Sequence, residues 1–81
     1  MKLENARILL TGATGGLGRE LARQLAASGA AVLLAGRDAA RLEALRASLG
    51  ARASLVVADL TRAEGVALMT RAAQDFGVNV L

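Results

Sequence analysis

The sequence has no cysteine and no histidine, and its single aromatic residue is Phe76. Without cysteine the chain has neither a disulfide nor a thiolate nucleophile. Without histidine it has neither a Ser–His pair nor a histidine-based metal site, and we expect no metal. Nine of the ten basic residues are arginines, spread along the chain without a cluster. Because nucleic-acid surfaces usually combine a basic cluster with stacking aromatics, we expect no nucleic-acid partner.

Long apolar runs are also absent. No run approaches the roughly 18–20 residues of a membrane span, and residues 1–10 lack the cleavage-site pattern of a secretory signal. We therefore expect a cytoplasmic protein with no membrane partner. The composition is nevertheless 54% hydrophobic over 81 residues. A chain of this size buries only about 60–65% of its unfolded surface, so the composition favours a piece of a larger domain.

Short apolar runs alternate with segments of helical periodicity. The predicted strands are residues 7–12, 30–37, 53–60 and 78–81, and the predicted helices are residues 17–28, 38–50 and 61–77. Continuous apolar runs are typical of strands buried on both faces. The order βαβαβαβ implies an α/β fold with a parallel sheet and right-handed crossovers. Because strands usually have about 5–6 residues, the four-residue last strand suggests an incomplete sheet.

Capping signals bound the predicted helices. Asp38 is the expected N-cap of the second helix, and Thr61 with Glu64 forms a capping box at the start of the third. Gly50 and Gly77 are expected to end these two helices. The apolar stripes expected to face the sheet are Leu17, Leu21 and Leu25 with Ala22 and Ala26 beside them, then Leu42, Leu45 and Leu49, then Val66, Met69, Ala73 and Phe76.

Four glycines stand between the first predicted strand and the first predicted helix: Gly12, Gly15, Gly16 and Gly18. A helix N-terminus offers unpaired N–H groups and a partial positive charge to an anion. Glycines let a pyrophosphate approach the backbone with no Cβ in the way. A tight loop without a ligand would explain one or two of these glycines but hardly four. The strand–turn–helix context therefore predicts a dinucleotide phosphate site.

With these motifs the chain resembles the short-chain dehydrogenase/reductases. Thr11, Gly12, Gly16 and Gly18 fit the family motif Thr-Gly-x-x-x-Gly-x-Gly. The same stretch, through Gly15, also fits the Thr-Gly-x-x-Gly-x-x-Gly pattern of the extended and atypical branches. The segments "AGRDAARLEAL", "VVADLT" and "FGVNVL" resemble the single-domain reductase-like branch, which we favour. The resemblance covers essentially the whole chain.

The resemblance implies a Rossmann-type three-layer sandwich, of which residues 1–81 would be the N-terminal half without an internal boundary. Asp59 would accept a hydrogen bond from the adenine amino group, and Leu60 would lie beside the ring. Capping of the helix that follows is the alternative role for Asp59. The residues implied to bind the cofactor are Gly12, Thr14, Gly15, Gly16, Leu17, Gly18, Arg37, Asp59 and Leu60.

Cofactor choice depends on the end of the second strand. NAD-preferring relatives carry a carboxylate there for the ribose hydroxyls, whereas this chain has Gly36 followed by Arg37. Because a guanidinium suits phosphate, NADP(H) is favoured over NAD(H). Asp38 would be the ribose-binding acid if the loop were shifted by one residue, although we favour the N-cap role. Many NADP-using relatives carry a basic residue just before the second motif glycine, where this chain has Gly15. Arg19 could help from the first turn of the helix, although we favour a position that faces solvent.

The family's catalytic serine, tyrosine and lysine have no counterpart here. The chain has no tyrosine, and its only lysine, Lys2, precedes the first strand. The resemblance thus implies the N-terminal, cofactor-binding part of an NAD(P)(H)-dependent oxidoreductase that acts on a carbonyl or alcohol. Intact relatives are commonly homo-oligomers, and we expect this chain alone to associate and to be catalytically silent. The alternative is a free-standing or vestigial half-domain that binds a dinucleotide without catalysis.

Overall fold

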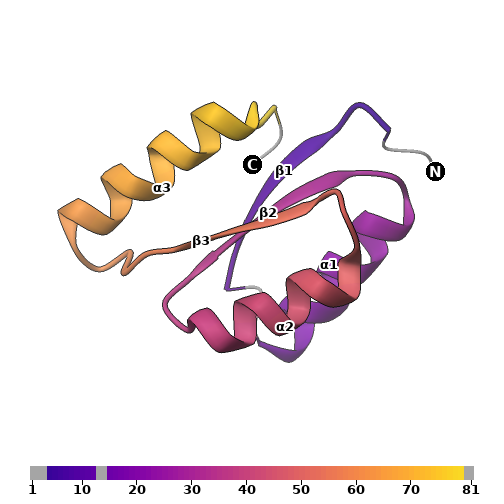
Figure 1. Ribbon diagram of the computed structural model, residues 1–81, viewed down its shortest axis with the longest axis horizontal. Coiled ribbons are helices and arrows are strands. Elements are labelled where there is room, and N and C mark those ends of the chain that lie inside the picture. Colours follow the sequence, from indigo (N-terminus) through magenta and orange to yellow (C-terminus); the bar gives the residue numbers. More distant parts are fainter. Residues whose placement is uncertain (1–3, 13–14, 80–81) are drawn as a thin grey trace.

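The computed structural model describes residues 4–12 and 15–79. Within them three strands alternate with three helices, and the strands form one parallel sheet in the order β1-β2-β3 (Figure 1). The elements are β1 (Arg7–Thr11), α1 (Gly16–Ala27), β2 (Ala31–Gly36), α2 (Ala39–Leu49), β3 (Ala53–Val57) and α3 (Ala63–Phe76). The predicted α/β class and the parallel sheet are confirmed.

Helices cover both faces of the sheet, with α1 and α2 on one side and α3 on the other (Figure 1). Alternate residues of β2 point to the two sides, so that its first five residues are all buried. The core on the α1–α2 side consists of Ile8, Ala22, Ala30, Val32, Leu34, Leu42 and Leu45. The core on the α3 side consists of Leu33, Ala35, Val56 and Ala58, with Met69, Ala72, Ala73 and Phe76 packed against it. This is the Rossmann-type three-layer arrangement.

The apolar stripe predicted for α1 is partly wrong. Leu17 and Leu21 are 86% and 43% exposed, whereas Ala22 is completely buried. The part of α1 that packs in the core is Ala22, which was expected beside the stripe, and Leu25, which was predicted in it. The small Ala22 side chain is completely buried, whereas the larger Leu17 and Leu21 side chains of the same helix remain exposed.

The other two stripes agree better with the structure. In α2, Leu42 and Leu45 are buried and Leu49 packs beside them, as predicted. In α3, Met69 and Phe76 pack on the sheet, but Val66 is 43% exposed. Val66 lies in the first turn of α3, before the residues of this helix that pack against the core.

Three of the four predicted capping signals are confirmed. The Asp38 side chain caps α2 by accepting a hydrogen bond from the Arg41 N–H at 3.1 Å. Gly50 follows α2 with φ +96°, and Gly77 follows α3 in the left-handed region with φ +79°. The Thr61–Glu64 capping box, in contrast, is wrong. The N-cap of α3 is Arg62, without a side-chain cap, because the Thr61 hydroxyl is engaged elsewhere.

The chain beyond α3 runs beside β1. The Asn79 N–H donates to the carbonyl of Arg7 at 2.9 Å, and the Arg7 N–H donates to Asn79 Oδ1 at 2.8 Å. Asn79 Nδ2 also donates to the carbonyl of Asn5 at 3.0 Å. Of the strand predicted over 78–81, residues 78–79 have no strand assignment, and residues 80–81 lie outside the described part of the chain. The position of Asn79 nevertheless agrees with a strand that would join the sheet next to β1.

Candidate functional site

The three strands are parallel, so their carboxyl ends share one edge of the sheet. Gly12 follows β1, Arg37 follows β2, and Asp59 lies two residues after β3. Open α/β sheets bind their ligands in the crevice outside this edge. The fold therefore brings the residues singled out in the sequence to one end of the molecule.

The turn between β1 and α1 depends on glycine. Gly12 has φ +68°, a left-handed conformation that favours glycine. The Gly15 N–H donates to the Gly12 carbonyl at 3.3 Å, and Gly15 then becomes the extended N-cap of α1. The Arg19 N–H makes the first bond of the helix, to the Gly15 carbonyl at 2.9 Å. Thr14, a predicted cofactor-binding residue, lies outside the described residues.

The N-terminus of α1 is open. Among residues 4–12 and 15–79 no side chain caps it, and its first turn contains no acidic residue. Gly16, Leu17 and Gly18 belong to the first helical turn, and the N–H groups of a first turn have no partners within the helix. A Cβ added at Gly16 would meet no atom of the described chain within 4 Å. Glycine at this position thus leaves space over the turn, and the helix dipole makes that space favourable for an anion.

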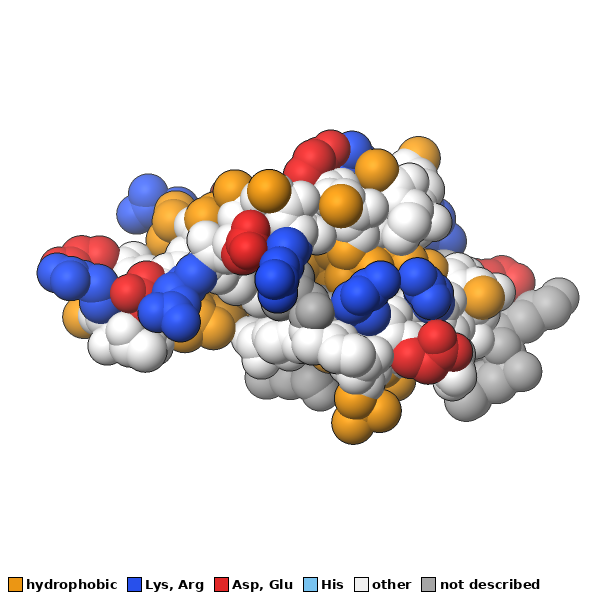
Figure 2. Space-filling model, turned by 90° about the horizontal axis from the view of Figure 1, so that it is seen from below, with side chains coloured by type: hydrophobic (Ala, Val, Ile, Leu, Met, Phe, Trp, Pro, Cys, Tyr) orange, Lys and Arg blue, Asp and Glu red, His pale blue; other side chains and the backbone are white. Residues whose placement is uncertain are grey.

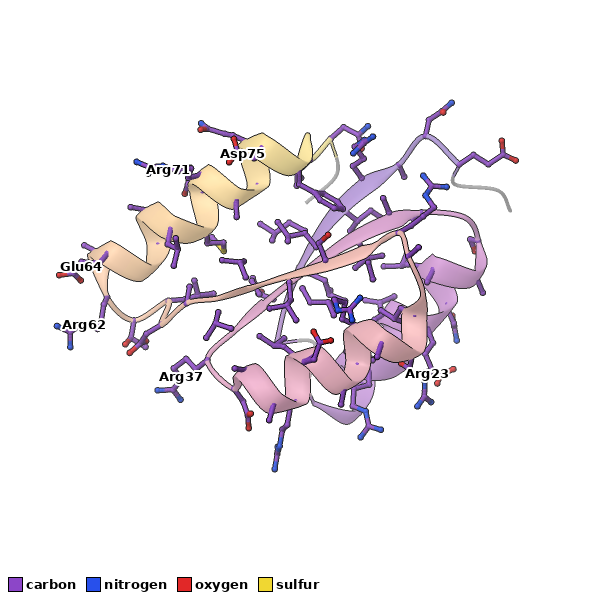
Figure 3. The ribbon with its side chains drawn as sticks, in the orientation of Figure 1. Arg23, Arg37, Arg62, Glu64, Arg71 and Asp75 are labelled. Carbon is purple, nitrogen blue, oxygen red and sulfur yellow. The ribbon has the colours of Figure 1, made fainter. Side chains whose placement is uncertain are left out.

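The end of β2 settles the register of the next loop. Gly36 is the last strand residue, Arg37 is exposed, and Asp38 is occupied as the N-cap of α2. Asp38 Oδ2 also lies 3.4 Å from Arg41 Nε. The N-cap role of Asp38 is thereby confirmed. Figure 3 shows Arg37 projecting outward from the turn after β2, at the end of the sheet where α3 begins.

Asp59 is held by its neighbours after β3. Its Oδ1 accepts hydrogen bonds from the Thr61 hydroxyl at 2.6 Å and from the Thr61 N–H at 3.0 Å. These two bonds, aided by the positive charge of Arg37 and opposed by partial burial, hold the pKa of the Asp59 carboxyl below its usual value. Since the carboxylate accepts these bonds before α3 begins, the alternative role as the cap of that helix is wrong.

Gly65, which the sequence analysis did not single out, brings α3 against the Asp59 backbone. It is buried in the first turn of the helix, and a Cβ added there would overlap the carbonyl group of Asp59. A glycine inside a helix costs roughly 1 kcal/mol relative to alanine. A glycine that stands among good helix formers therefore indicates that another segment of backbone lies close to the helix.

The remaining predicted residues flank this edge. Leu17, in the first turn of α1, is the most exposed large hydrophobic residue among those described, whereas Leu60 is half-buried against the α3 side of the core.

Arg19 is exposed, as predicted. With Arg23 and Arg41 it lines a groove of about 500 Å³ between α1 and α2. Figure 2 shows basic side chains around a hydrophobic hollow on the underside of the molecule.

Two other kinds of site are not found in the described part of the chain. Residues 4–12 and 15–79 contain no group of three or more potential metal-ligating side chains. None of the helices within the same residues has both the length and the apolar character needed to span a bilayer.

Comparison with known proteins agrees with this geometry. The family model of the short chain dehydrogenases matches residues 6–81. A galactitol 2-dehydrogenase (L-tagatose-forming) of Cereibacter sphaeroides is 44% identical over 75 residues, covering 91% of this chain and 28% of that protein.

Two solved structures with bound dinucleotides are also similar. A 3-ketoacyl-(acyl-carrier-protein) reductase from Brucella melitensis, complexed with NADH, has a TM-score of 0.86 at 34% identity, covering 94% of this chain and 32% of that one. An NADPH-bound short chain oxidoreductase from Pseudomonas aeruginosa PAO1 has a TM-score of 0.83 at 31% identity, covering 93% and 31%. The chain spans less than a third of the length of each of these three proteins. With its glycine turn, its parallel sheet and these matches, the chain belongs to the short-chain dehydrogenase family.

Proposed function

We propose that this chain is the N-terminal cofactor-binding part of an NAD(P)(H)-dependent oxidoreductase that transfers hydride between the nicotinamide and a carbonyl or alcohol substrate. The observation that carries the proposal is the open N-terminus of α1, which follows a glycine turn at the carboxyl edge of a parallel sheet. Relatives named as dehydrogenases and reductases, one bound to NADH and one to NADPH, support the same reaction class.

The pyrophosphate would bind over the glycine turn, where first-turn N–H groups offer hydrogen bonds and the missing Cβ atoms leave room. Gly12, Thr14, Gly15, Gly16, Leu17 and Gly18 would form this subsite. Asp59 would accept from the adenine amino group, with Leu60 beside the ring. The bound cofactor would supply the hydride, while the residues of this chain bind and orient its adenosine half.

NADP(H) is favoured over NAD(H) at the end of β2. Gly36 provides no carboxylate for the ribose hydroxyls, and the nearby carboxylate of Asp38 already caps α2. The Arg37 guanidinium is exposed and makes no salt bridge within 4.0 Å to another described residue. It is therefore available to pair with a 2′-phosphate in a charge-assisted hydrogen bond.

In this proposal the chain binds the cofactor but does not supply the groups that react with the substrate. It contains no tyrosine, and its one lysine precedes β1, so the general acid/base would come from residues outside this chain. We expect the intact oxidoreductase to be cytoplasmic and homo-oligomeric. The absence of tyrosine equally suits the alternative, a half-domain that binds a dinucleotide without catalysis.

Titration with NADPH and with NADH tests the proposal. The chain has no tryptophan, so the fluorescence of the reduced nicotinamide reports binding without a protein background. We expect NADPH to bind more tightly than NADH, and no oxidation of NADPH with a promiscuous carbonyl substrate. Failure of both dinucleotides to bind would overturn the proposed function. Measurable turnover would overturn the assignment of the reacting groups to residues outside this chain.

Light scattering over a dilution series addresses association. Leu17, Leu21, Val57, Val66 and Leu68 are exposed large hydrophobic residues, and such surface favours self-association. We expect the apparent mass to rise with concentration. A constant monomer mass at high concentration would contradict this part of the proposal.

A further inference from the structure

We infer that Thr61 and Gly65 are positioning residues, which hold Asp59 so that its Oδ2 faces the exocyclic amino group of the cofactor adenine. The inference rests on the proposed function, because it assigns the adenine subsite to the loop between β3 and α3. It adds two residues to that subsite and names the chemical feature of the base that they select.

Thr61 fixes the carboxylate through a single oxygen. Both of its donors, the hydroxyl at 2.6 Å and the N–H at 3.0 Å, converge on Oδ1 of Asp59. Oδ2 accepts no hydrogen bond from any described residue in the structure. An ionised carboxylate is an acceptor only and has lone pairs on both oxygens. Oδ2 therefore retains its full capacity to accept from a ligand, while rotation of the group is restrained at Oδ1.

Gly65 fixes the Asp59 backbone from the side of α3, and a hydrogen bond to the end of β2 fixes the residue that precedes Asp59. The missing side chain of Gly65 lets the first turn of α3 rest on the Asp59 carbonyl, which also accepts from the Arg62 N–H at 3.2 Å. On the strand side, the Ala58 N–H donates to the Gly36 carbonyl at 2.8 Å. The position of Asp59 is thus fixed relative both to α3 and to the end of β2, which Arg37 follows.

The exposure of Thr61 argues against a purely structural role. Its side chain is exposed, belongs to neither core cluster, and does not cap α3. Its only side-chain hydrogen bond among the described residues goes to Asp59. Removal of the hydroxyl would therefore change the orientation of that carboxylate with little effect on packing.

This arrangement selects a donor on the base. Adenine presents an amino group at its six-position, whereas hypoxanthine presents a carbonyl oxygen there, and a carboxylate can pair with the first but not with the second. Aspartate is ionised at neutral pH, and the Thr61 bonds lower the pKa of the Asp59 carboxyl further, so the acceptor stays ionised into more acidic solution. We expect the loop to discriminate between the two bases.

The experiment compares NADPH with its reduced hypoxanthine analogue in the full chain and in Thr61→Val, a variant of nearly the same shape. We expect Thr61→Val to weaken NADPH binding about five- to tenfold, since one hydrogen bond that orients the acceptor is lost. Binding of the hypoxanthine analogue should change by less than about twofold, since no bond to its six-position depends on that hydroxyl. Thr61→Ser, which retains the hydroxyl, should restore the wild-type ratio.

The pH dependence gives a second measurement. Without the Thr61 hydroxyl the pKa of Asp59 moves up toward its usual value. As the pH is lowered, Asp59 in Thr61→Val should therefore be protonated at a higher pH than in the wild type, and the affinity for NADPH should begin to fall at that higher pH. Asp59→Asn should lose the adenine preference at every pH. Gly65→Ala should weaken NADPH binding more than binding of the hypoxanthine analogue, with circular dichroism as the check on its fold.

The outcomes separate the inference from the function on which it rests. Equal losses for both dinucleotides in Thr61→Val, or no loss for either, would overturn the positioning role while dinucleotide binding itself remained. A wild-type chain that binds neither dinucleotide would instead overturn the proposed function. A wild-type chain that binds both dinucleotides equally would remove Asp59 from the adenine subsite.

Discussion

The N-termini of α1 and α2 lie at the same edge of the same sheet, yet the chain treats them differently. The start of α2 is closed by Asp38, which accepts from the Arg41 N–H. The start of α1 follows Gly15 and has no side-chain cap. Both helices point the same end of their dipole toward this edge. The difference teaches that a side chain closes one helix start and so serves the stability of the fold, while the other start has no side-chain cap among the described residues and is the one proposed to bind an anion.

The largest effect on dinucleotide binding is expected when a side chain blocks the uncapped N-terminus of α1. Gly16→Val should weaken dinucleotide binding by about a hundredfold or more, because its side chain would occupy the space that the pyrophosphate needs. Circular dichroism should hardly change, since a Cβ at Gly16 meets no described atom within 4 Å. The matched control is Ala39→Val, at the first position of the capped helix. Normal cofactor binding by Gly16→Val would show that the phosphates do not lie over this turn.

The next effect concerns the loop that joins the end of β2 to the capped helix. Arg37→Ala should weaken NADPH binding about tenfold or more, because a charge-assisted hydrogen bond to the 2′-phosphate is lost. NADH binding should barely move. Arg71→Ala serves as the control, since this arginine projects from α3 away from the sheet edge (Figure 3). An equal loss for both dinucleotides would contradict the assignment and point to Asp38 instead.

A third variant introduces the carboxylate that NAD-preferring relatives carry. A Cβ at Gly36 would meet only the Leu42 side chain, at an ordinary 3.7 Å, so Gly36→Asp should fold. The new charge should weaken NADPH binding about fivefold by repulsion of the 2′-phosphate, and should strengthen NADH binding through the ribose hydroxyls. Gly36→Asn separates charge from size, and titrations with both dinucleotides decide. Unchanged preference in Gly36→Asp would place the ribose away from this strand end.

The smallest effect tests the closed helix start. Asp38→Ala should lower the free energy of unfolding by about 1 kcal/mol, the usual cost of removing an N-cap. Dinucleotide affinity should not change, because the Asp38 carboxylate already accepts from the Arg41 N–H and we assign it no ligand. Denaturant unfolding measures the first quantity, and nicotinamide fluorescence measures the second. A selective loss of NADH affinity would make Asp38 a ribose ligand after all.

The sequence was sufficient for the order of the elements and for the cap at Asp38, since both leave local signals. Continuous apolar runs and helical periodicity are properties of neighbouring residues, and an aspartate before a helical pattern caps through its own backbone neighbours. The convergence of the glycine turn, Arg37 and Asp59 also followed, because parallel strands place their carboxyl ends together.

Long-range packing could not be predicted in the same way. The face of α1 that packs in the core passes through Ala22 and Leu25, and leaves Leu17 exposed. Thr61 matched a capping box, but its hydroxyl bonds to Asp59. Gly65 acquires its meaning only from the Asp59 carbonyl beside it. In each case the deciding contact depends on how closely two elements approach, a quantity that periodicity does not contain.

The bonds between Arg7 and Asn79 have a consequence for the order of folding. They join residues that are 72 positions apart in the chain, whereas the β1–β2 and β2–β3 pairings join residues through a single intervening helix. Closing so long a loop costs about 4 kcal/mol of chain entropy, and the reward comes only after α3 has docked on the sheet. This pairing should therefore form last and open first. In hydrogen exchange, the amides of Arg7 and Asn79 should lose protection before those of β2.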